Sequence, residues 1–301
     1  MKDFKDLAGS AAAIRLARAA SRIFPPAMTY WASWQAAGLL VRLRPRVFQV
    51  VQANLRQVVG AEVDEQDLDQ IVRQAFSTTI RGYYDLFRAL RLPRDQMAGL
   101  IHFSESGLEI LRSLWHREEG SLLVMPHLGN FDLAGQALAP LLPETQVISL
   151  RDPPPGFQLT NEIREASGVM VTPLSPAALR QAIQLLRRGG TVSTAVDRPV
   201  SDLDEPVMFF GRPARLPSGP IRLALKTGAV IVQAYCVWSP EAGEYQMTID
   251  PPLEMVRTGD RDEEVRVNMQ IMLDRLEPVI RRWPGQWQMY VPVWSDSPAD
   301  L

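Results

Sequence analysis

Cysteine and histidine are scarce in this sequence. Cys236 is the only cysteine in 301 residues, so an intramolecular disulfide and a zinc site built on several cysteines are both excluded. There are three histidines, and no second histidine or cysteine stands at ligand spacing from His127. We therefore expect neither a bound metal nor a resident cofactor.

An excess of charge of one sign is also missing. The net charge is −2, so bulk charge indicates no nucleic-acid partner. The distribution is uneven, because residues 1–60 carry nine Lys and Arg against two Asp, a net +7, which leaves −9 for the rest of the chain. A basic, apolar amino end suits an anionic membrane surface. A solvated basic helix is the alternative that charge alone leaves open.

No segment is an uninterrupted apolar run of membrane-spanning length. Residues 1–22 have the pattern of an amphipathic helix without the compact apolar core of a signal peptide. Residues 23–41 lack charge, but prolines and polar residues dilute their apolarity, and Tyr30, Trp31 and Trp34 cluster as in interfacial belts. We expect a helix that lies on the membrane or packs on the domain, with a true span as the alternative.

The order of the predicted elements indicates an α/β fold. The first part of the chain is helical, with apolar periodicity over 47–59 and 68–92. From Ser121 onward strands and helices alternate, which is typical of a mainly parallel central sheet flanked by helices. A short edge strand is predicted at 100–105, and further strands at 122–125, 146–150, 169–171, 191–196, 229–237 and 245–249.

The candidate site lies where two of these strands end. His127 follows the strand 122–125 directly after Pro126, and Asp197 with Arg198 follows the strand 191–196. The carboxyl ends of parallel strands share one edge of the sheet, where ligands bind in open α/β folds. Asp132, in the first turn of the next helix, is predicted to accept the Nδ1–H of His127 and leave Nε2 as a general base. A His–carboxylate pair without catalytic function is the alternative.

A set of motifs resembles one enzyme family. The segment His127-Leu-Gly-Asn-Phe-Asp132 resembles the H-x4-D block of glycerolipid acyltransferases, part of the lysophospholipid acyltransferase superfamily. The later blocks FFGRPARLPSGP and GAVIVQAY, together with Asn54-Leu55, VDRP and PGQW, are similar to the lipid A late-acyltransferase family. That family includes the actinobacterial phosphatidylinositol mannoside acyltransferases. The resemblance covers roughly residues 45–295, and Asp132, where many lipid A enzymes carry Glu, favours the mannoside branch.

The resemblance implies a glycerol-3-phosphate-acyltransferase-like fold and a reaction. An acyl group would move from a thioester, on coenzyme A or acyl carrier protein, to a hydroxyl of a membrane lipid or glycolipid. His127 would be the general base, backbone N–H groups at the start of the following helix would stabilise the oxyanion, and no acyl-enzyme is needed. Arg164 matches the family's basic residue and, with Asp197 and Arg198, would bind substrate; surface or loop-bracing ion pairs are the alternative.

One motif departs from the family pattern. Mannoside acyltransferases place a Glu shortly before the FF-G block as a partner of the catalytic histidine. Here Pro206, Val207 and Met208 precede Phe209, and Glu205 is the nearest acid. Glu205 is therefore a candidate third catalytic residue. Because its distance from the FF-G block differs from the family pattern, its role and the acceptor type stay open.

The chain is thus expected to comprise a membrane-associating helical extension, residues 1–45, and an acyltransferase domain, residues 46–301. We expect it at the cytoplasmic face of the inner membrane, peripheral rather than spanning. Two alternatives remain: a thioesterase-like hydrolase that uses the same histidine to activate water, and a non-catalytic lipid-binding homologue.

Overall fold

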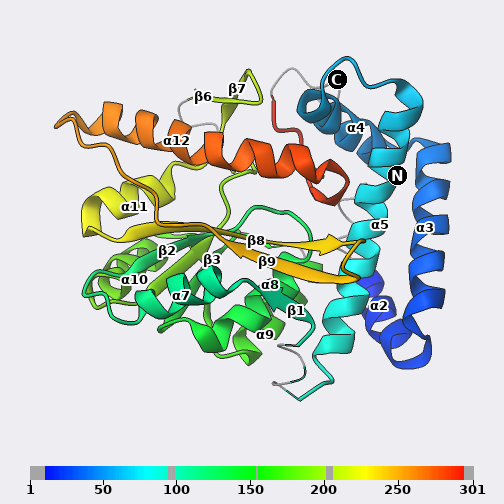
Figure 1. Ribbon diagram of the computed structural model, residues 1–301, viewed down its shortest axis with the longest axis horizontal. Coiled ribbons are helices and arrows are strands. Elements are labelled where there is room, and N and C mark those ends of the chain that lie inside the picture. The colour runs from blue at the N-terminus through cyan, green and yellow to red at the C-terminus, as the bar shows by residue number, and fades with distance from the viewer. Residues whose placement is uncertain (1–10, 94–95, 97–98, 154, 201–205, 295–301) are drawn as a thin grey trace.

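A seven-stranded sheet forms the centre of the molecule (Figure 1). The computed structural model describes residues 11–93, 96, 99–153, 155–200 and 206–294. Within them the strand order is β1-β9-β8-β2-β5-β3-β4, and every pairing of this sheet is parallel except β8 with β9. The predicted α/β class with a mainly parallel sheet is therefore confirmed. The strands are β1 (Ile101–Phe103), β2 (Ser121–Val124), β3 (Thr145–Ser149), β4 (Met170–Pro173), β5 (Thr191–Thr194), β8 (Val230–Ser239) and β9 (Glu244–Ile249).

Helices cover both faces of this sheet. The chain moves outward from β2 to β3 and β4, then returns to insert β5 between β2 and β3. Because parallel crossovers are right-handed, this reversal puts the connecting helices on opposite faces. One face carries α7 (Glu105–Leu114), α8 (Phe131–Leu138) and α9 (Pro155–Ala166), and the other α10 (Pro176–Arg187), α11 (Gly219–Thr227) and α12 (Arg261–Arg282).

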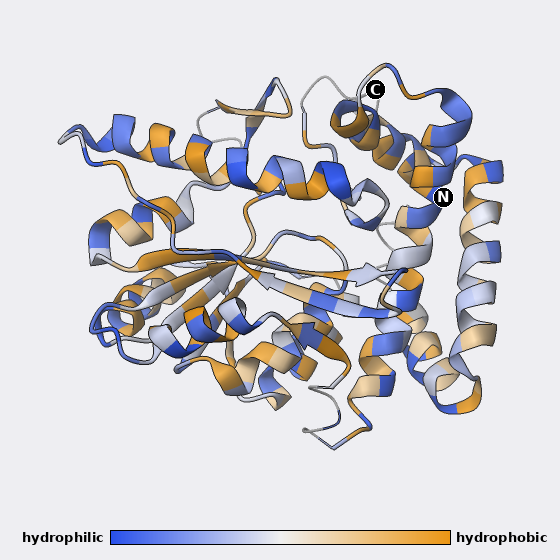
Figure 2. Ribbon diagram, viewed as in Figure 1, coloured by the Kyte–Doolittle hydropathy of each residue, from blue (hydrophilic) through white to orange (hydrophobic). Residues whose placement is uncertain are grey.

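Strand β2 is buried on both faces. Leu122 and Val124 belong to the core beneath α10–α12, and Leu123 to the core beneath α7 and α8. A strand covered on both sides is apolar throughout rather than alternating, as the sequence of β2 is. Figure 2 shows the same apolar character along the central strands.

In the described part of the chain, four helices precede the sheet. They are α2 (Ala11–Ile23), α3 (Pro26–Leu43), α4 (Arg46–Val59) and α5 (Glu65–Ala89). Both α2 and α3 pack against α5, at the right of Figure 1. This matches the predicted helical amino-terminal part, of which residues 1–10 lie outside the described residues.

A buried carboxylate fixes α3 to the rest of the fold. Asp85 of α5 accepts hydrogen bonds from Tyr30 of α3 (2.7 Å) and Tyr245 of β9 (2.6 Å), one on each oxygen. The Arg81 guanidinium lies 4.0 Å from the ring centroid of Tyr30 and 3.6 Å from that of Trp238. Burial, together with the charge of Asp85, raises the pKa of Tyr30 and of Tyr245, so both phenols stay protonated donors.

No helix in the described part of the chain is both long enough and apolar enough to cross a bilayer. The proposed boundary at residue 45 falls at Pro45, the N-cap residue of α4, directly after Arg44 turns the chain with positive φ. Whether residues 1–45 form a separate membrane-associating unit remains a prediction.

Two local predictions differ from the structure. The sequence predicts a turn over 208–214, and the turn lies there, at Phe210 and Gly211, but it joins the unpredicted strands β6 (Pro206–Phe209) and β7 (Arg212–Arg215) of an antiparallel hairpin. The segment RDPPPG predicts a rigid loop over 151–156 and a helix only from 159, whereas α9 begins at Pro155. In α9 a proline occupies the first helical position, where its missing N–H costs nothing, so the proline run marked a helix start rather than a loop.

Candidate functional site

The loop that follows β2 is held rigidly by the carboxyl-terminal segment. The His127 carbonyl accepts from the N–H of Gln288 (2.7 Å), and the Gly129 N–H donates to the Gln286 carbonyl (2.9 Å). The Asn130 N–H donates to the Cys236 carbonyl of β8 (3.0 Å). The backbone is therefore fixed at His127 itself and at the residues that follow it in the loop.

Gly129 is required by this close approach. Its φ is +61°, and a Cβ built on it would lie 1.9 Å from the Cys236 carbonyl oxygen. Any side chain would push the loop away from β8, so glycine is the only residue that lets His127 keep this position.

Asp197 is the partner of His127. It follows β5, which pairs directly with β2, so the two residues leave adjacent strands at the same edge. One carboxylate oxygen accepts from the His127 backbone N–H (2.8 Å) and the indole N–H of Trp287 (2.9 Å), and the other lies 2.8 Å from His127 Nδ1. The side chain is fully buried.

The charge state of Asp197 sets the tautomer of His127. Burial alone would raise the pKa of the Asp197 carboxyl, but the charge of His127 and the hydrogen bonds from His127 and Trp287 outweigh it, so the pKa lies below its usual value. An ionised carboxylate only accepts, so the proton sits on Nδ1 of His127 and Nε2 has a free lone pair. The ring of Phe131 stands edge-on to the imidazole, with centroids 5.4 Å apart, and restricts its rotation.

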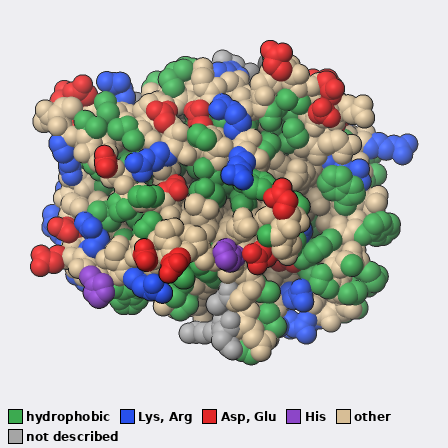
Figure 3. Space-filling model, in the orientation of Figure 1, with side chains coloured by type: hydrophobic (Ala, Val, Ile, Leu, Met, Phe, Trp, Pro, Cys, Tyr) green, Lys and Arg blue, Asp and Glu red, His purple; other side chains and the backbone are tan. Residues whose placement is uncertain are grey.

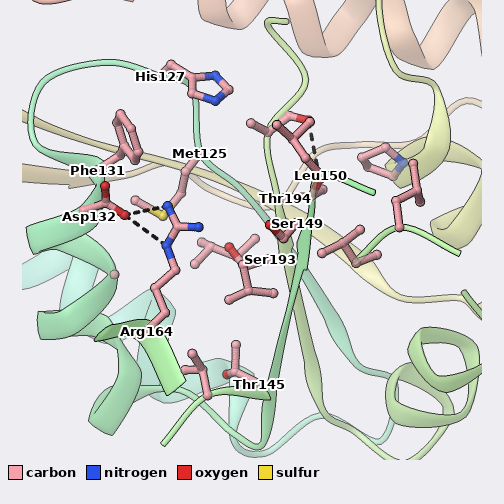
Figure 4. A pocket seen from close by; sticks show the side chains of 18 of the residues that line it. Met125, His127, Phe131, Asp132, Thr145, Ser149, Leu150, Arg164, Ser193 and Thr194 are labelled. Carbon is pink, nitrogen blue, oxygen red and sulfur yellow. Dashed lines mark hydrogen bonds and ion pairs between the residues drawn. The ribbon is translucent and has the colours of Figure 1, made fainter. Parts of the chain in front are cut away.

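The predicted His127–Asp132 contact was wrong. Asp132 lies in the first turn of α8, as expected, but its Oδ1 accepts from Nε (3.0 Å) and Nη2 (2.6 Å) of Arg164 on α9. Figure 4 shows Phe131 between His127 and this ion pair. Asn161, one turn before Arg164, accepts from Nη1 (2.9 Å) and holds the guanidinium in place. The carboxylate near the histidine in sequence therefore fixes α8 to α9, and the distant one orients the imidazole.

A cavity of about 740 Å³ opens at His127. Most of its lining is apolar, as is usual for sites that enclose a small molecule or an acyl chain. One part lies along the face beneath α8 and α9, where it passes Leu123, Val147 and Ser193 and ends near Thr145; the other reaches Leu179 and Leu223 of α10 and α11. In Figure 4, Thr145 is the labelled residue farthest from His127.

Three arginines line the cavity, Arg151, Arg164 and Arg198. Burial lowers the pKa of Arg198, Asp197 raises it, and Arg164 lowers it further. A guanidinium nevertheless remains protonated near neutral pH. The guanidinium groups of Arg164 and Arg198 suit an anionic substrate group such as a phosphate.

Glu205, the candidate third catalytic residue, lies outside the described residues.

The backbone donors expected for an oxyanion are largely engaged. The N–H groups of Leu128, Gly129 and Asn130 each donate to a carbonyl of the protein, and Asn130 Oδ1 caps the N–H of Leu133. Only the N–H groups of Phe131 and Asp132, at the start of α8, remain candidates for that role.

Trp287 was missed as a site residue from the sequence. The sequence predicts core positions for the large aromatic residues of the tryptophan-rich tail, and Trp287 is 1% exposed. Its indole N–H also donates to Asp197. A buried tryptophan normally needs an acceptor for this group, so its place in PGQW was the available signal.

In the part of the chain that the structure describes, no group of three or more His, Cys, Asp or Glu side chains is placed to hold a metal ion.

Comparisons with known proteins show what this chain is similar to. The family model described as bacterial lipid A biosynthesis acyltransferase matches residues 12–295. A phosphatidylinositol mannoside acyltransferase of Mycolicibacterium smegmatis is 28% identical over 255 residues, which cover 83% of this chain and 80% of that protein. A protein of the same name from Mycobacterium tuberculosis is 27% identical over 83% of this chain and 77% of its own length.

The pairing of His127 can be tested by NMR, since the chain has three histidines. An Nδ1–H that donates to a buried carboxylate gives a downfield proton signal, because the anion deshields it. We expect this signal in the wild-type protein, its loss in Asp197→Asn, and its retention in the matched variant Asp132→Asn. Loss of the signal in Asp132→Asn alone would restore the pairing predicted from the sequence.

Asp197 should also make stability depend on pH. Its pKa is lowered in the folded state, so its contribution is fully present above the unfolded value of about 4 and is lost as the pH falls through the folded value. We expect Asp197→Asn to lower the free energy of unfolding near neutral pH by about 3 kcal/mol. Denaturant unfolding should show this difference shrinking in acid; a difference that stays constant would contradict the lowered pKa.

Proposed function

Because this chain belongs to the bacterial lipid A biosynthesis acyltransferase family, whose members acylate lipid acceptors, we propose that it transfers a fatty acyl group from an acyl thioester to a hydroxyl of a glycolipid at the membrane surface. One observation carries the proposal: His127 lines an apolar cavity, its Nδ1 pairs with the buried Asp197, and its Nε2 is left free. The relatives named phosphatidylinositol mannoside acyltransferase favour a glycolipid acceptor.

The residues support a direct transfer. Nε2 of His127 takes the proton of the acceptor hydroxyl as its oxygen attacks the thioester carbonyl, and a tetrahedral intermediate forms. The intermediate collapses with cleavage of the C–S bond, and the leaving thiolate takes the proton from Nε2. Asp197 stabilises the imidazolium that exists between these steps and keeps it in one orientation.

Each substrate has a candidate region in this proposal. The acyl chain occupies the apolar cavity, and Arg164 and Arg198 contact a phosphate of the donor or of the acceptor head group. The donor is an acyl thioester of coenzyme A or of acyl carrier protein, which share the reacting group.

An anionic membrane is the proposed surface on which the enzyme works. Large apolar side chains of α2 and α3 are exposed, among them Leu16 (72%), Trp31 (67%) and Leu43 (66%). Arg18 and Arg22 of α2 and Arg42 of α3 are exposed beside them. Figure 3 shows hydrophobic side chains gathered over α3, with basic side chains above and below them. Apolar side chains flanked by arginines are the pattern of a helix that lies in an anionic interface.

The proposed reaction is tested with the purified protein, radiolabelled palmitoyl-CoA and a lipid extract from its host. We expect a new labelled lipid, and a rate about 10²–10⁴-fold lower in His127→Ala, because a general base contributes this much. His116→Ala is the matched control, since His116 is exposed and does not line the cavity. Labelled free fatty acid without labelled lipid would identify a hydrolase, and equal lipid labelling by His127→Ala would remove His127 from the mechanism.

The proposed membrane contact is tested by sedimentation with phosphatidylglycerol-containing vesicles. Replacing Trp31 and Leu39 together by Glu should weaken binding at least about tenfold, because two large apolar groups are lost from the interface. Met208→Glu is the control, since Met208 is similarly apolar and exposed (45%) but lies on the β6–β7 hairpin. Equal binding by the wild type and the double variant would exclude α3 as the contact.

A further inference from the structure

Gly135 occupies an unexpected position in the middle of α8. A glycine in a helix interior costs about 1 kcal/mol relative to alanine, and Gly135 is the one glycine in this helix. Its φ is not positive, and a Cβ built on it would meet no atom within 4 Å. Neither the backbone nor a neighbouring side chain therefore requires glycine here.

The open space beside Gly135 is the cavity. Phe131, Asp132, Gly135 and Leu138 are spaced three and four apart along α8, and all four line the cavity. Residues at this spacing share one helical face. A side chain at position 135 would therefore extend into the cavity, between the side chains one turn before it and one turn after it.

Gly135 lies between the reacting end of the cavity and its far end. Helix α8 runs from the His127 loop toward η1 (Ala139–Leu141), and Leu142 and Thr145, toward the opposite edge of the sheet, line the cavity there. The Cα of Gly135 is about 6 Å beyond that of Phe131 along the helix axis, at 1.5 Å per residue. Strand β3 gives the length of this wall, about 13 Å from Ser149 to Thr145 at 3.3 Å per residue.

We propose that the missing side chain at Gly135 sets the longest acyl chain that this protein accepts. This inference rests on the proposed function, in which the acyl chain enters the cavity with its carbonyl at His127. The chain then passes the Asp132–Arg164 ion pair and uses the space over Gly135 to reach Leu138 and Leu142. A larger residue closes this passage, so that short chains still place their carbonyl correctly and long chains do not.

The test is a graded series, Gly135→Ala and Gly135→Leu, assayed with octanoyl-, lauroyl- and palmitoyl-CoA. Transfer is measured as kcat/KM, and binding of each acyl-CoA by calorimetry. For each protein, kcat/KM and the binding constant for the longest chain that the wild type accepts are divided by the values for octanoyl-CoA. We expect Gly135→Leu to lower both of these ratios at least about tenfold, because added methylenes in a closed pocket discriminate by this much. Gly135→Ala should give a smaller change in the same direction.

Two features separate this role from a structural one. Gly135→Ala should unfold at the same or a higher temperature, because alanine is the better helix residue and meets no clash. Ala177→Leu is the matched control, since Ala177 is an exposed residue of α10 that does not line the cavity. Its chain-length profile should equal that of the wild type.

The outcomes distinguish the inference from the proposed function. Transfer with an unchanged length profile in Gly135→Leu overturns the inference and leaves the function in place. Equal loss for all chain lengths, with a lower unfolding temperature, also overturns it. If the wild type transfers nothing but the variant loses binding of long chains only, the cavity assignment holds and the proposed reaction fails. Length-independent binding without transfer overturns both.

Discussion

The buried carboxylate of Asp197 is the interaction on which the site depends. It accepts three hydrogen bonds, two from His127 and one from Trp287. It thereby joins the loop after β2, the loop after β5 and the carboxyl-terminal segment. A buried carboxylate without donors would be neutral or would destabilise the fold. Here the donors keep it ionised, and the same hydrogen bonds that satisfy it also fix the position and the tautomer of the imidazole.

The arrangement divides the acidic residues by function. Asp197 orients the imidazole of His127, whereas Asp132 pairs with Arg164 and joins α8 to α9. Asp85, which does not line the cavity, joins α3 to α5 and to β9. In each case a carboxylate with more than one donor connects elements that are distant in sequence. These contacts hold the walls of the cavity and the exposed helix α3 in a fixed relation to His127.

Much of the fold could be predicted because the signals are local. The apolar run 122–124 ended by Pro126 predicts β2. Ser175-Pro176, a capping serine before a proline at the first helical position, predicts the start of α10, where Ser175 caps the N–H of Ala178. The strands of the β6–β7 hairpin were missed, because each is four residues long and contains a proline, which argues against a strand. Trp287 was taken as core because burial and hydrogen bonding of an indole cannot be told apart from sequence.

The sequence by itself determined most of the helices and strands and the motifs that resemble the family. It also determined the edge of the sheet at which His127, Asp197 and Arg198 gather. Only the tertiary structure decided which carboxylate meets His127. Asp132 is five positions away and Asp197 is 70, so proximity along the chain favoured the wrong partner. The strands appear in the order β2, β3, β4, β5, but β5 pairs beside β2. That neighbour relation arises from long-range strand pairing, which local sequence patterns do not encode.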